Sequence, residues 1–187
     1  MYFGRLVKWL THRPLKATFT GSNPVPVTKI KGEYMSLIEA KEYLKNKGFL
    51  DRVIILDKSS STVELAAIAL NCNTNSIAKT MAFSLQNKDI LVLLSGDTKI
   101  DNSKFKSEFG EKAKMIKAEE LNEKIGHEMG GVCPFGIKAN VEVYLDESLK
   151  QEDIVYPACG SSNSAVKLTI EELEKCSQYI KWVNIGK

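Results

Sequence analysis

The sequence predicts an α+β fold with a mixed β-sheet and flanking helices. Segments of strand and helix character interleave along the 187 residues without the regular rhythm of a βαβ protein. Two neighbouring apolar segments, 77–85 and 89–95, are joined by a short polar connection, which predicts a β-hairpin. Three Ser/Thr-x-x-Glu patterns predict the starts of separate helices. This length and a 43% apolar content suit one domain with a substantial core.

Capping boxes predict where three helices begin. In each, a hydroxyl side chain and a glutamate three residues later satisfy each other's free backbone N–H groups. The three boxes are Ser36–Glu39, Ser61–Glu64 and Thr169–Glu172. The first helix is expected to end near Gly48, since glycine is common just after a helix, and the second near Leu70. The other predicted elements are helices at 102–109 and 119–125, and strands at 52–57, near 115, at 141–145, 153–156, 166–168 and 179–185.

Residues 1–34 are expected to be an N-terminal extension of a domain that spans 35–187. The extension holds six of the 26 basic residues and one of the 23 acidic ones, so the remaining 20 basic and 22 acidic residues give the domain a net charge of −2. Two explanations for the extension stay open. It has the acid-poor composition of a transit peptide. Alternatively, Lys31-Gly-Glu-Tyr-Met35 can be encoded by a purine-rich ribosome-binding sequence before an ATG, which would make 1–34 a translated leader rather than native protein.

Composition excludes several classes of protein. The apolar runs, such as residues 90–94, are far too short to span a bilayer, so no membrane association is expected. The four cysteines form no C-x-x-C pair and no ligand-like spacing with the two histidines, which argues against a metal site or a disulfide framework. A reducing cytoplasm is therefore the expected compartment, and no cofactor is expected.

A lysine within the predicted hairpin is a candidate functional residue. Side chains alternate along a strand, so Lys79 shares one face with the apolar Met81 and Phe83. Full burial without a partner would lower the pKa of a lysine by about 3–5 units. Lys79 is therefore expected at the edge of the core, facing a cavity or an anion. The alternative is an ordinary lysine at a strand end whose charged group reaches solvent.

A glycine-rich stretch forms the second candidate feature. Residues 126–138 contain four glycines and a proline among apolar residues, which is unlike a flexible Gly/Ser linker. We expect a rigid loop that presents backbone N–H groups to a ligand. A pair of ordinary tight turns would explain the same composition.

Four short motifs together resemble the YbaK family, the aminoacyl-tRNA editing domains that also occur inserted in bacterial prolyl-tRNA synthetases. In order along the chain they are Ile77-Ala-Lys-Thr80, Leu94-Ser-Gly-Asp97, Gly130-Gly-Val-Cys-Pro-Phe-Gly136 and Tyr156-Pro-Ala-Cys-Gly160. The resemblance covers residues 35–185. It implies a mixed, partly barrel-like sheet with flanking helices, and hydrolysis of the ester that joins a wrong amino acid to tRNA.

The resemblance also assigns roles to individual residues. It implies that Lys79 and the backbone of Gly130 are catalytic. The substrate-binding residues expected from the same motifs are Thr80, Gly131, Cys133, Gly160 and Ser161. The implied partners are the acceptor end of an aminoacylated tRNA and an aminoacyl-tRNA synthetase, and the implied substrate is a small amino acid on a noncognate tRNA, with tRNA-Pro the expected one.

Two departures from the family pattern leave alternatives open. The acidic or histidine side chain that some members carry after the last glycine is replaced by Ala165, Val166 and Lys167, and Cys133 stands where serine or threonine is common. One alternative is a thiol hydrolase with Cys133 as nucleophile and His127 as base. The other is a non-catalytic module that binds tRNA or nucleotide ends.

Overall fold

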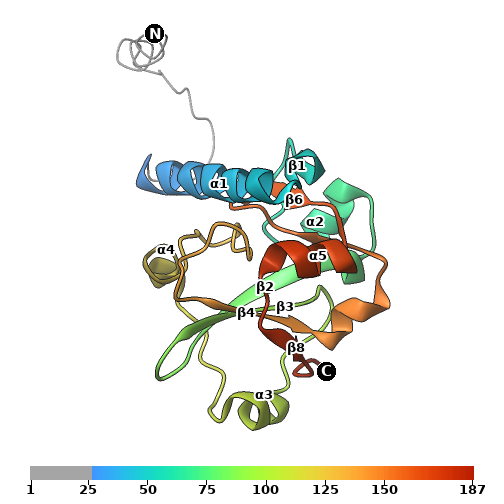
Figure 1. The fold of residues 1–187 in the computed structure, drawn as a ribbon. Coiled ribbons are helices and arrows are strands. Elements are labelled where there is room, and N and C mark those ends of the chain that lie inside the picture. The colour runs from blue at the N-terminus through green and yellow to red at the C-terminus, as the bar shows by residue number, and fades with distance from the viewer. Residues whose placement is uncertain (1–26) are drawn as a thin grey trace.

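The computed structural model describes residues 27–187, with side chains from residue 34 onward. Its main sheet has six strands in the order β7-β5-β2-β3-β4-β8, and β1 and β6 form a separate two-stranded sheet (Figure 1). The strands are β1 (Val53–Ile55), β2 (Ile77–Ser84), β3 (Asp89–Ser95), β4 (Glu142–Asp146), β5 (Ile154–Pro157), β6 (Ser164–Val166), β7 (Leu168–Thr169) and β8 (Lys181–Val183). The α-helices are α1 (Val27–Lys47), α2 (Val63–Leu70), α3 (Asn102–Phe109), α4 (Leu121–Lys124) and α5 (Ile170–Ser177). Short 3-10 helices are η2 (Leu50–Arg52), η3 (Thr74–Ser76), η4 (Ala118–Glu120) and η5 (Glu147–Gln151).

The main sheet is mixed and curls into a half-barrel, which confirms the predicted α+β class. Strands β2 and β3 pair antiparallel from Ala78–Ser95 to Ser84–Asp89, so the predicted hairpin is present. The pairs β3–β4, β4–β8 and β2–β5 are parallel. The β2–β5 ladder is short, since it contains only two residue pairs.

Strand β2 separates two hydrophobic cores, because its alternate side chains point to opposite faces. Ala78 and Ala82 belong to the larger core, which α1 and α5 cover. Phe83 belongs to a second core on the other face, beneath α3, where its ring centroid lies 4.8 Å from that of Phe105. Figure 1 shows α1 and α5 on one side of the sheet and α3 on the other.

One of the three predicted helix starts is confirmed. Thr169 caps α5, and Thr169 and Glu172 exchange both hydrogen bonds of the capping box. The prediction at Ser36 is wrong, because α1 begins at Val27 and passes through this position. The Ser36 hydroxyl instead donates to the carbonyl of Gly126 at 3.0 Å, so the residue joins α1 to the glycine-rich stretch.

The other differences are shifts of element ends. Helix α2 is capped by Thr62 rather than Ser61, and the Thr62 side chain accepts from the Leu65 amide at 3.3 Å. The expected strand near 115 is a single bridge between Phe83 and Met115. The expected strand at 166–168 is divided between β6 and β7. Hydrophobic alternation locates such elements but does not fix their last residues, which depend on the neighbouring strand.

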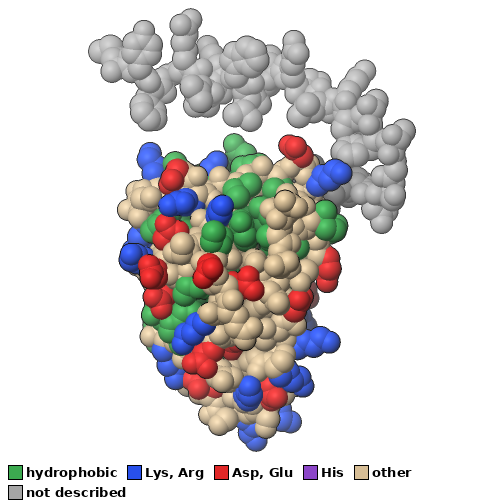
Figure 2. All heavy atoms as spheres, turned by 90° about the vertical axis from the view of Figure 1, so that its right-hand side faces the viewer, with side chains coloured by type: hydrophobic (Ala, Val, Ile, Leu, Met, Phe, Trp, Pro, Cys, Tyr) green, Lys and Arg blue, Asp and Glu red, His purple; other side chains and the backbone are tan. Residues whose placement is uncertain are grey.

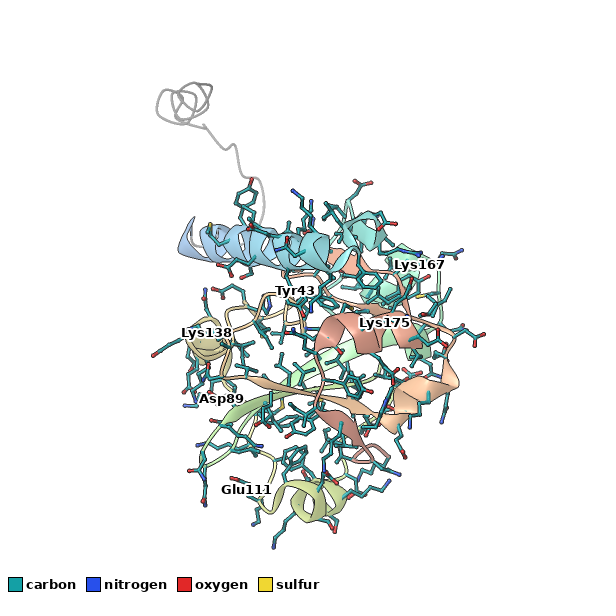
Figure 3. The ribbon with its side chains drawn as sticks, in the orientation of Figure 1. Tyr43, Asp89, Glu111, Lys138, Lys167 and Lys175 are labelled. Carbon is teal, nitrogen blue, oxygen red and sulfur yellow. The ribbon has the colours of Figure 1, made fainter. Side chains whose placement is uncertain are left out.

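Helix α1 is fastened to α5 across the larger core. The Tyr43 hydroxyl donates to the Cys176 carbonyl at 2.7 Å, and Figure 3 shows Tyr43 between the two helices. Burial raises the pKa of Tyr43 to about 12, so the phenol stays protonated and remains a donor.

None of the helices among residues 27–187 is long and apolar enough to cross a membrane.

Candidate active site

Two glycine turns pack directly against each other. The first lies in the glycine-rich loop (residues 126–138), between α4 and β4, and the second follows β5. The Gly160 amide donates to the Gly131 carbonyl at 3.1 Å. A Cβ atom at residue 131 would lie 2.5 Å from the carbonyl carbon of Gly160, which is closer than any real contact. Glycine at 131 is therefore required by this backbone-to-backbone packing.

The same turns also press against α1. A Cβ atom at residue 160 would lie 2.4 Å from the Ser36 carbonyl oxygen, and one at residue 136 would lie 2.8 Å from the Glu39 carbonyl carbon. Both glycines also have positive φ, +76° at Gly160 and +66° at Gly136. Three of the glycines that the motifs singled out thus serve close packing between the loops and α1.

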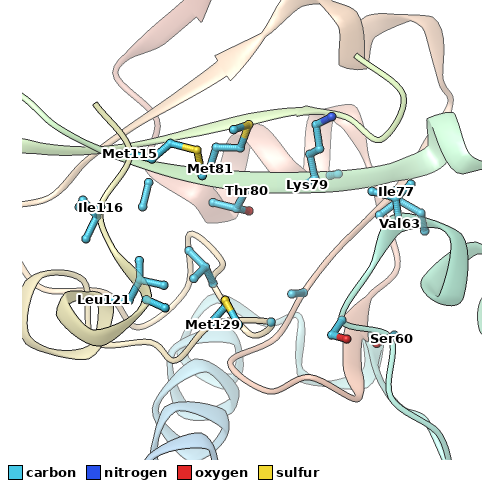
Figure 4. A pocket seen from close by; sticks show the side chains of 17 residues that line it. Ser60, Val63, Ile77, Lys79, Thr80, Met81, Met115, Ile116, Leu121 and Met129 are labelled. Carbon is cyan, nitrogen blue, oxygen red and sulfur yellow. The ribbon is translucent and has the colours of Figure 1, made fainter. Parts of the chain in front are cut away.

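A cavity of about 370 Å³ opens beside these turns, within the size range of small-molecule sites. Most of its wall is apolar, and its polar wall residues come from β2 and from the segment before α2 (Figure 4). The wall is formed by Ser60, Ser61, Val63, Ile77, Ala78, Lys79, Thr80, Met81, Ala82, Met115, Ile116, Ala118, Leu121, Met129, Gly130, Val132 and Ala158.

Gly130 is the glycine of the loop that lines the cavity. Its φ of +94° is a conformation that favours glycine. A Cβ atom there would lie 3.2 Å from the Cβ of Ser162 and 3.4 Å from that of Ser61, so a side chain would crowd the cavity wall. Among residues 27–187, the Gly130 amide has no backbone acceptor. This N–H group is therefore available to a ligand in the cavity.

Lys79 and Thr80 both line the cavity, but their side chains lie on opposite sides of β2 (Figure 4). The Lys79 ammonium is half-buried and donates to two backbone carbonyls of the turn after β3, Gly96 at 2.8 Å and Thr98. Burial lowers the pKa of Lys79, while nearby Asp97 opposes the shift. Lys79 thus lies at the edge of the core, as expected, but its ammonium group is bonded by two backbone carbonyls rather than by an anion.

The Thr80 hydroxyl lies on the side of the strand that faces Met129 and Ser60. Its oxygen is buried and has no hydrogen-bond partner among the described residues. A buried hydroxyl without a partner costs about 1–3 kcal/mol, which a bound ligand or water can relieve. Thr80 therefore contributes a hydroxyl group to an otherwise apolar part of the cavity wall.

The proposed thiol pair is brought together but buried. Cys133 and His127 are both 0% exposed, and the Sγ atom lies 3.6 Å from Nε2. Nε2 lies 2.9 Å from the Phe135 carbonyl, which can only accept, so this nitrogen carries a proton. Burial raises the pKa of the Cys133 thiol and lowers the pKa of His127 to about 4. Neither residue lines the cavity, so Cys133 is a core thiol.

Ser161 and Gly160 lie behind the cavity wall, as does Gly131. The Ser161 hydroxyl bonds within its own turn, to Asn163 at 2.9 Å and Ser164 at 2.8 Å. This turn supports the segment before α2, since the Ser162 carbonyl accepts from the Ser60 amide at 2.6 Å.

Among residues 27–187, no three His, Cys, Asp or Glu side chains are grouped to hold a metal ion.

Sequence reasoning missed several wall residues, chiefly Ser60 and three methionines, Met81, Met115 and Met129. They come from four separate segments, and no local pattern links them. The exposed fractions of Met115 and Met129, 59% and 57%, are large for apolar side chains. These two residues therefore present flexible, apolar surface beside the cavity.

Residues 57–176 match the family model of the aminoacyl-tRNA editing domain. The chain is 42% identical to the uncharacterized protein YwhH of Bacillus subtilis (strain 168) over 154 residues, which cover 82% of this chain and 98% of YwhH. It is 28% identical to the proline–tRNA ligase of Bacillus cytotoxicus over 134 residues, 70% of this chain but only 23% of that ligase.

Among solved structures, one described as a candidate trans-editing enzyme for prolyl tRNA synthetase superposes with a TM-score of 0.75 at 27% identity, covering 81% of this chain and 97% of that one. The hypothetical protein APE2540 superposes with a TM-score of 0.71 at 25% identity, covering 80% of this chain and 99% of that one. The family match, the ordered motifs and this shared fold agree, and the chain belongs to the aminoacyl-tRNA editing domain family.

Proposed function

We propose that this protein is an aminoacyl-tRNA deacylase that hydrolyses the ester between a small amino acid and a noncognate tRNA. One observation carries the proposal: the Gly130 amide, free of a backbone acceptor, lines a small and largely apolar cavity together with Thr80 and Lys79. Ester hydrolysis needs N–H donors aimed at the oxygen that becomes negatively charged, and glycine supplies one without side-chain obstruction.

In the proposed reaction, water attacks the ester carbonyl carbon and the bond to the ribose oxygen breaks. The developing oxyanion accepts from the Gly130 N–H. The leaving ribose oxygen takes one proton of the attacking water, the other proton passes to solvent, and the amino acid departs as its carboxylate. No imidazole lines the cavity among the described residues, and His127 is buried behind it. Water activation therefore falls to a group of the substrate, and the neighbouring ribose hydroxyl is the candidate.

Lys79 supplies positive charge beside the cavity, on the side of β2 opposite the Thr80 hydroxyl. An ammonium group has three N–H donors, and two of them point to the Gly96 and Thr98 carbonyls. The third remains for a phosphate at the tRNA end or for the substrate carbonyl. Since the two carbonyls hold the ammonium group in place, it does not have to move to stabilise charge during the reaction.

The cavity's size and apolar wall support a small amino acid as the acyl group. We propose tRNA-Pro as the tRNA, with a synthetase as a further partner, because the relatives include proline–tRNA ligases and a structure described as acting in trans for prolyl tRNA synthetase. The face in Figure 2 carries acidic and basic side chains interspersed. Such a surface suits a small footprint at the acceptor end rather than binding along the whole tRNA.

A panel of pre-charged tRNAs tests the proposal. Purified protein is incubated with tRNA-Pro that carries alanine, serine, cysteine or proline, and release of the amino acid is followed against a no-enzyme control. Release of at least one small amino acid, with prolyl-tRNA-Pro spared, is expected. Binding without release from any member would show that the protein is a binding module. Loss of release on alkylation of Cys133 would revive the thiol mechanism.

A further inference from the structure

The cavity lies where one edge of β2 has no neighbouring strand. On that edge the β5 ladder ends at the Ala78–Pro157 pair, and the next backbone contact is the Phe83–Met115 bridge. Between these two points no described segment pairs with β2. The gap falls inside a central strand of the sheet, where an open edge is unusual.

The cavity wall has the composition that an open edge produces. Six consecutive residues of β2, from Ile77 to Ala82, line it. Successive side chains point to opposite faces, so one face of a strand contributes only alternate residues. A run of consecutive residues means that the backbone edge itself faces the cavity. The two flanks of the gap, Ala158 and Met115–Ile116, also line it.

The backbone groups that face the gap belong to Thr80. In an antiparallel pair, residues that bond their partner alternate with residues whose N–H and C=O groups point to the other edge. The Ala82 carbonyl accepts from the Ile116 amide, so Ala82 faces away from β3. Thr80, two residues earlier, faces the same way. Among residues 27–187 its N–H and C=O have no backbone partner.

We propose that the aminoacyl group binds to this edge as a one-residue strand, with Thr80 as its partner. This inference rests on the proposed function and deepens it. Two residues in a hydrogen-bonded antiparallel pair exchange two N–H···O bonds. An α-aminoacyl ester carries the same two groups: its ammonium donates to the Thr80 carbonyl, and its ester carbonyl accepts from the Thr80 amide. That carbonyl has two lone pairs, so Gly130 can donate to it as well.

This geometry makes the α-amino group, rather than the side chain, the feature that the site recognises. Any α-aminoacyl ester can make both bonds, and the cavity walls then limit the side chain by size. A simple acyl ester, which lacks the amine, leaves the Thr80 carbonyl unpaired. An α-hydroxyacyl ester keeps a donor but loses the charge. Recognition should therefore rank aminoacyl above hydroxyacyl above simple acyl groups.

Two non-hydrolysable probes test this edge directly. They are 3′-deoxyadenosines whose 3′-amine carries either an alanyl or a propionyl group, and they differ only in the α-amino group. Each is titrated into the full-length protein, and amide hydrogen exchange is measured by NMR. The alanyl probe should slow exchange of the Thr80 amide at least about tenfold and bind about 10- to 100-fold more tightly than the propionyl probe. The Met81 amide, which faces β3, is the internal control and should not change.

Equal binding of the two probes would overturn the inference, as would a bound alanyl probe that shifts the Gly130 amide but leaves Thr80 exchange unchanged. Absence of binding by both probes would also overturn it. The panel of charged tRNAs separates this outcome from failure of the proposed function. If the protein releases amino acids but the alanyl probe does not slow exchange of the Thr80 amide, binding at the β2 edge is rejected and the deacylase function stands. If the probe slows Thr80 exchange but no charged tRNA is hydrolysed, the deacylase function is rejected and the binding site at the β2 edge stands.

Discussion

The ammonium of Lys79 donates a hydrogen bond of 2.8 Å to the carbonyl of Gly96, seventeen residues further along the chain. Lys79 lies on β2 and Gly96 directly follows β3, so the bond closes the open end of the hairpin. It ties the residue proposed to act on the substrate to the turn that carries Asp97. The position of the positive charge is therefore set by the hairpin and not by the side chain alone.

Replacing Lys79 with alanine is expected to abolish deacylation, with a loss of at least about 100-fold in kcat/KM. The variant should fold but lose about 1–2 kcal/mol in the free energy of unfolding, because the Gly96 and Thr98 carbonyls lose their donor. Deacylation assays and urea titration measure the two effects. The exposed Lys99 is the matched control, and Lys99→Ala should keep normal activity. Full activity of Lys79→Ala would remove Lys79 from the mechanism.

Replacing Cys133 with alanine should leave most deacylation intact. Cys133 is fully buried and its thiol pKa is raised, so the thiolate that a nucleophile requires is absent at neutral pH. The cost should be about 1 kcal/mol of stability from the small space left in the core. Alkylation of native protein, followed by peptide mass spectrometry, should modify the partly exposed Cys72 first. Rapid modification of Cys133 with parallel loss of activity would contradict this prediction.

Stability should fall as the pH drops from about 6.5 to about 4. The pKa of His127 is lowered from 6.5 to about 4 by burial, so the folded state keeps it neutral while the unfolded state takes up a proton below pH 6.5. The stability that the neutral form provides is complete above pH 6.5 and declines toward pH 4, by up to about 3 kcal/mol. Urea titrations across this range measure the decline. His127→Gln lacks this titration and should show a shallower decline; an unchanged pH profile would mean that other groups dominate.

Glycine at position 131 should be far less replaceable than glycine at position 110. Gly131→Ala places a methyl group 2.5 Å from the Gly160 backbone, so the two turns must separate, at a cost of about 3 kcal/mol or more. Gly110 has a φ of +79°, and a Cβ atom there would meet nothing within 4 Å, so Gly110→Ala carries only backbone strain of about 1 kcal/mol. Thermal unfolding of both variants gives the comparison. Equal costs would show that the turns are not in contact in solution.

Binding to tRNA should depend only weakly on salt. The predicted domain carries a net charge of −2, and a footprint confined to the acceptor end neutralises few phosphates. Each phosphate on a single strand contributes about 0.7 to the slope of log K against log salt. Filter binding of uncharged tRNA at a series of salt concentrations, on protein that begins at Met35, measures this slope. A slope as steep as that of a large basic interface would contradict the small footprint.

The sequence by itself determined the features that depend on neighbours along the chain. Alternation of apolar residues located the β2–β3 hairpin, and the Thr169–Glu172 pattern fixed the start of α5, because both signals act over a few residues. The order of four motifs identified the family. The same local patterns could not show that α1 starts at Val27. Ser36 fits the capping-box pattern in the sequence, but its hydroxyl bonds the carbonyl of Gly126, 90 residues away.

Only the tertiary structure decided what each motif residue does. Gly130, Gly131 and Gly160 look alike in sequence, but one lines the cavity and the other two are packed backbone against backbone. Cys133 and His127 lie close together, as the thiol alternative requires. Burial in the core, however, raises the pKa of the thiol and lowers the pKa of the imidazole, which opposes formation of a thiolate. The open edge at Thr80 exists because the β2–β5 ladder ends at the Ala78–Pro157 pair, before it reaches Thr80. Such contacts join segments far apart in the chain, and their energies depend on distance and burial that no local pattern records.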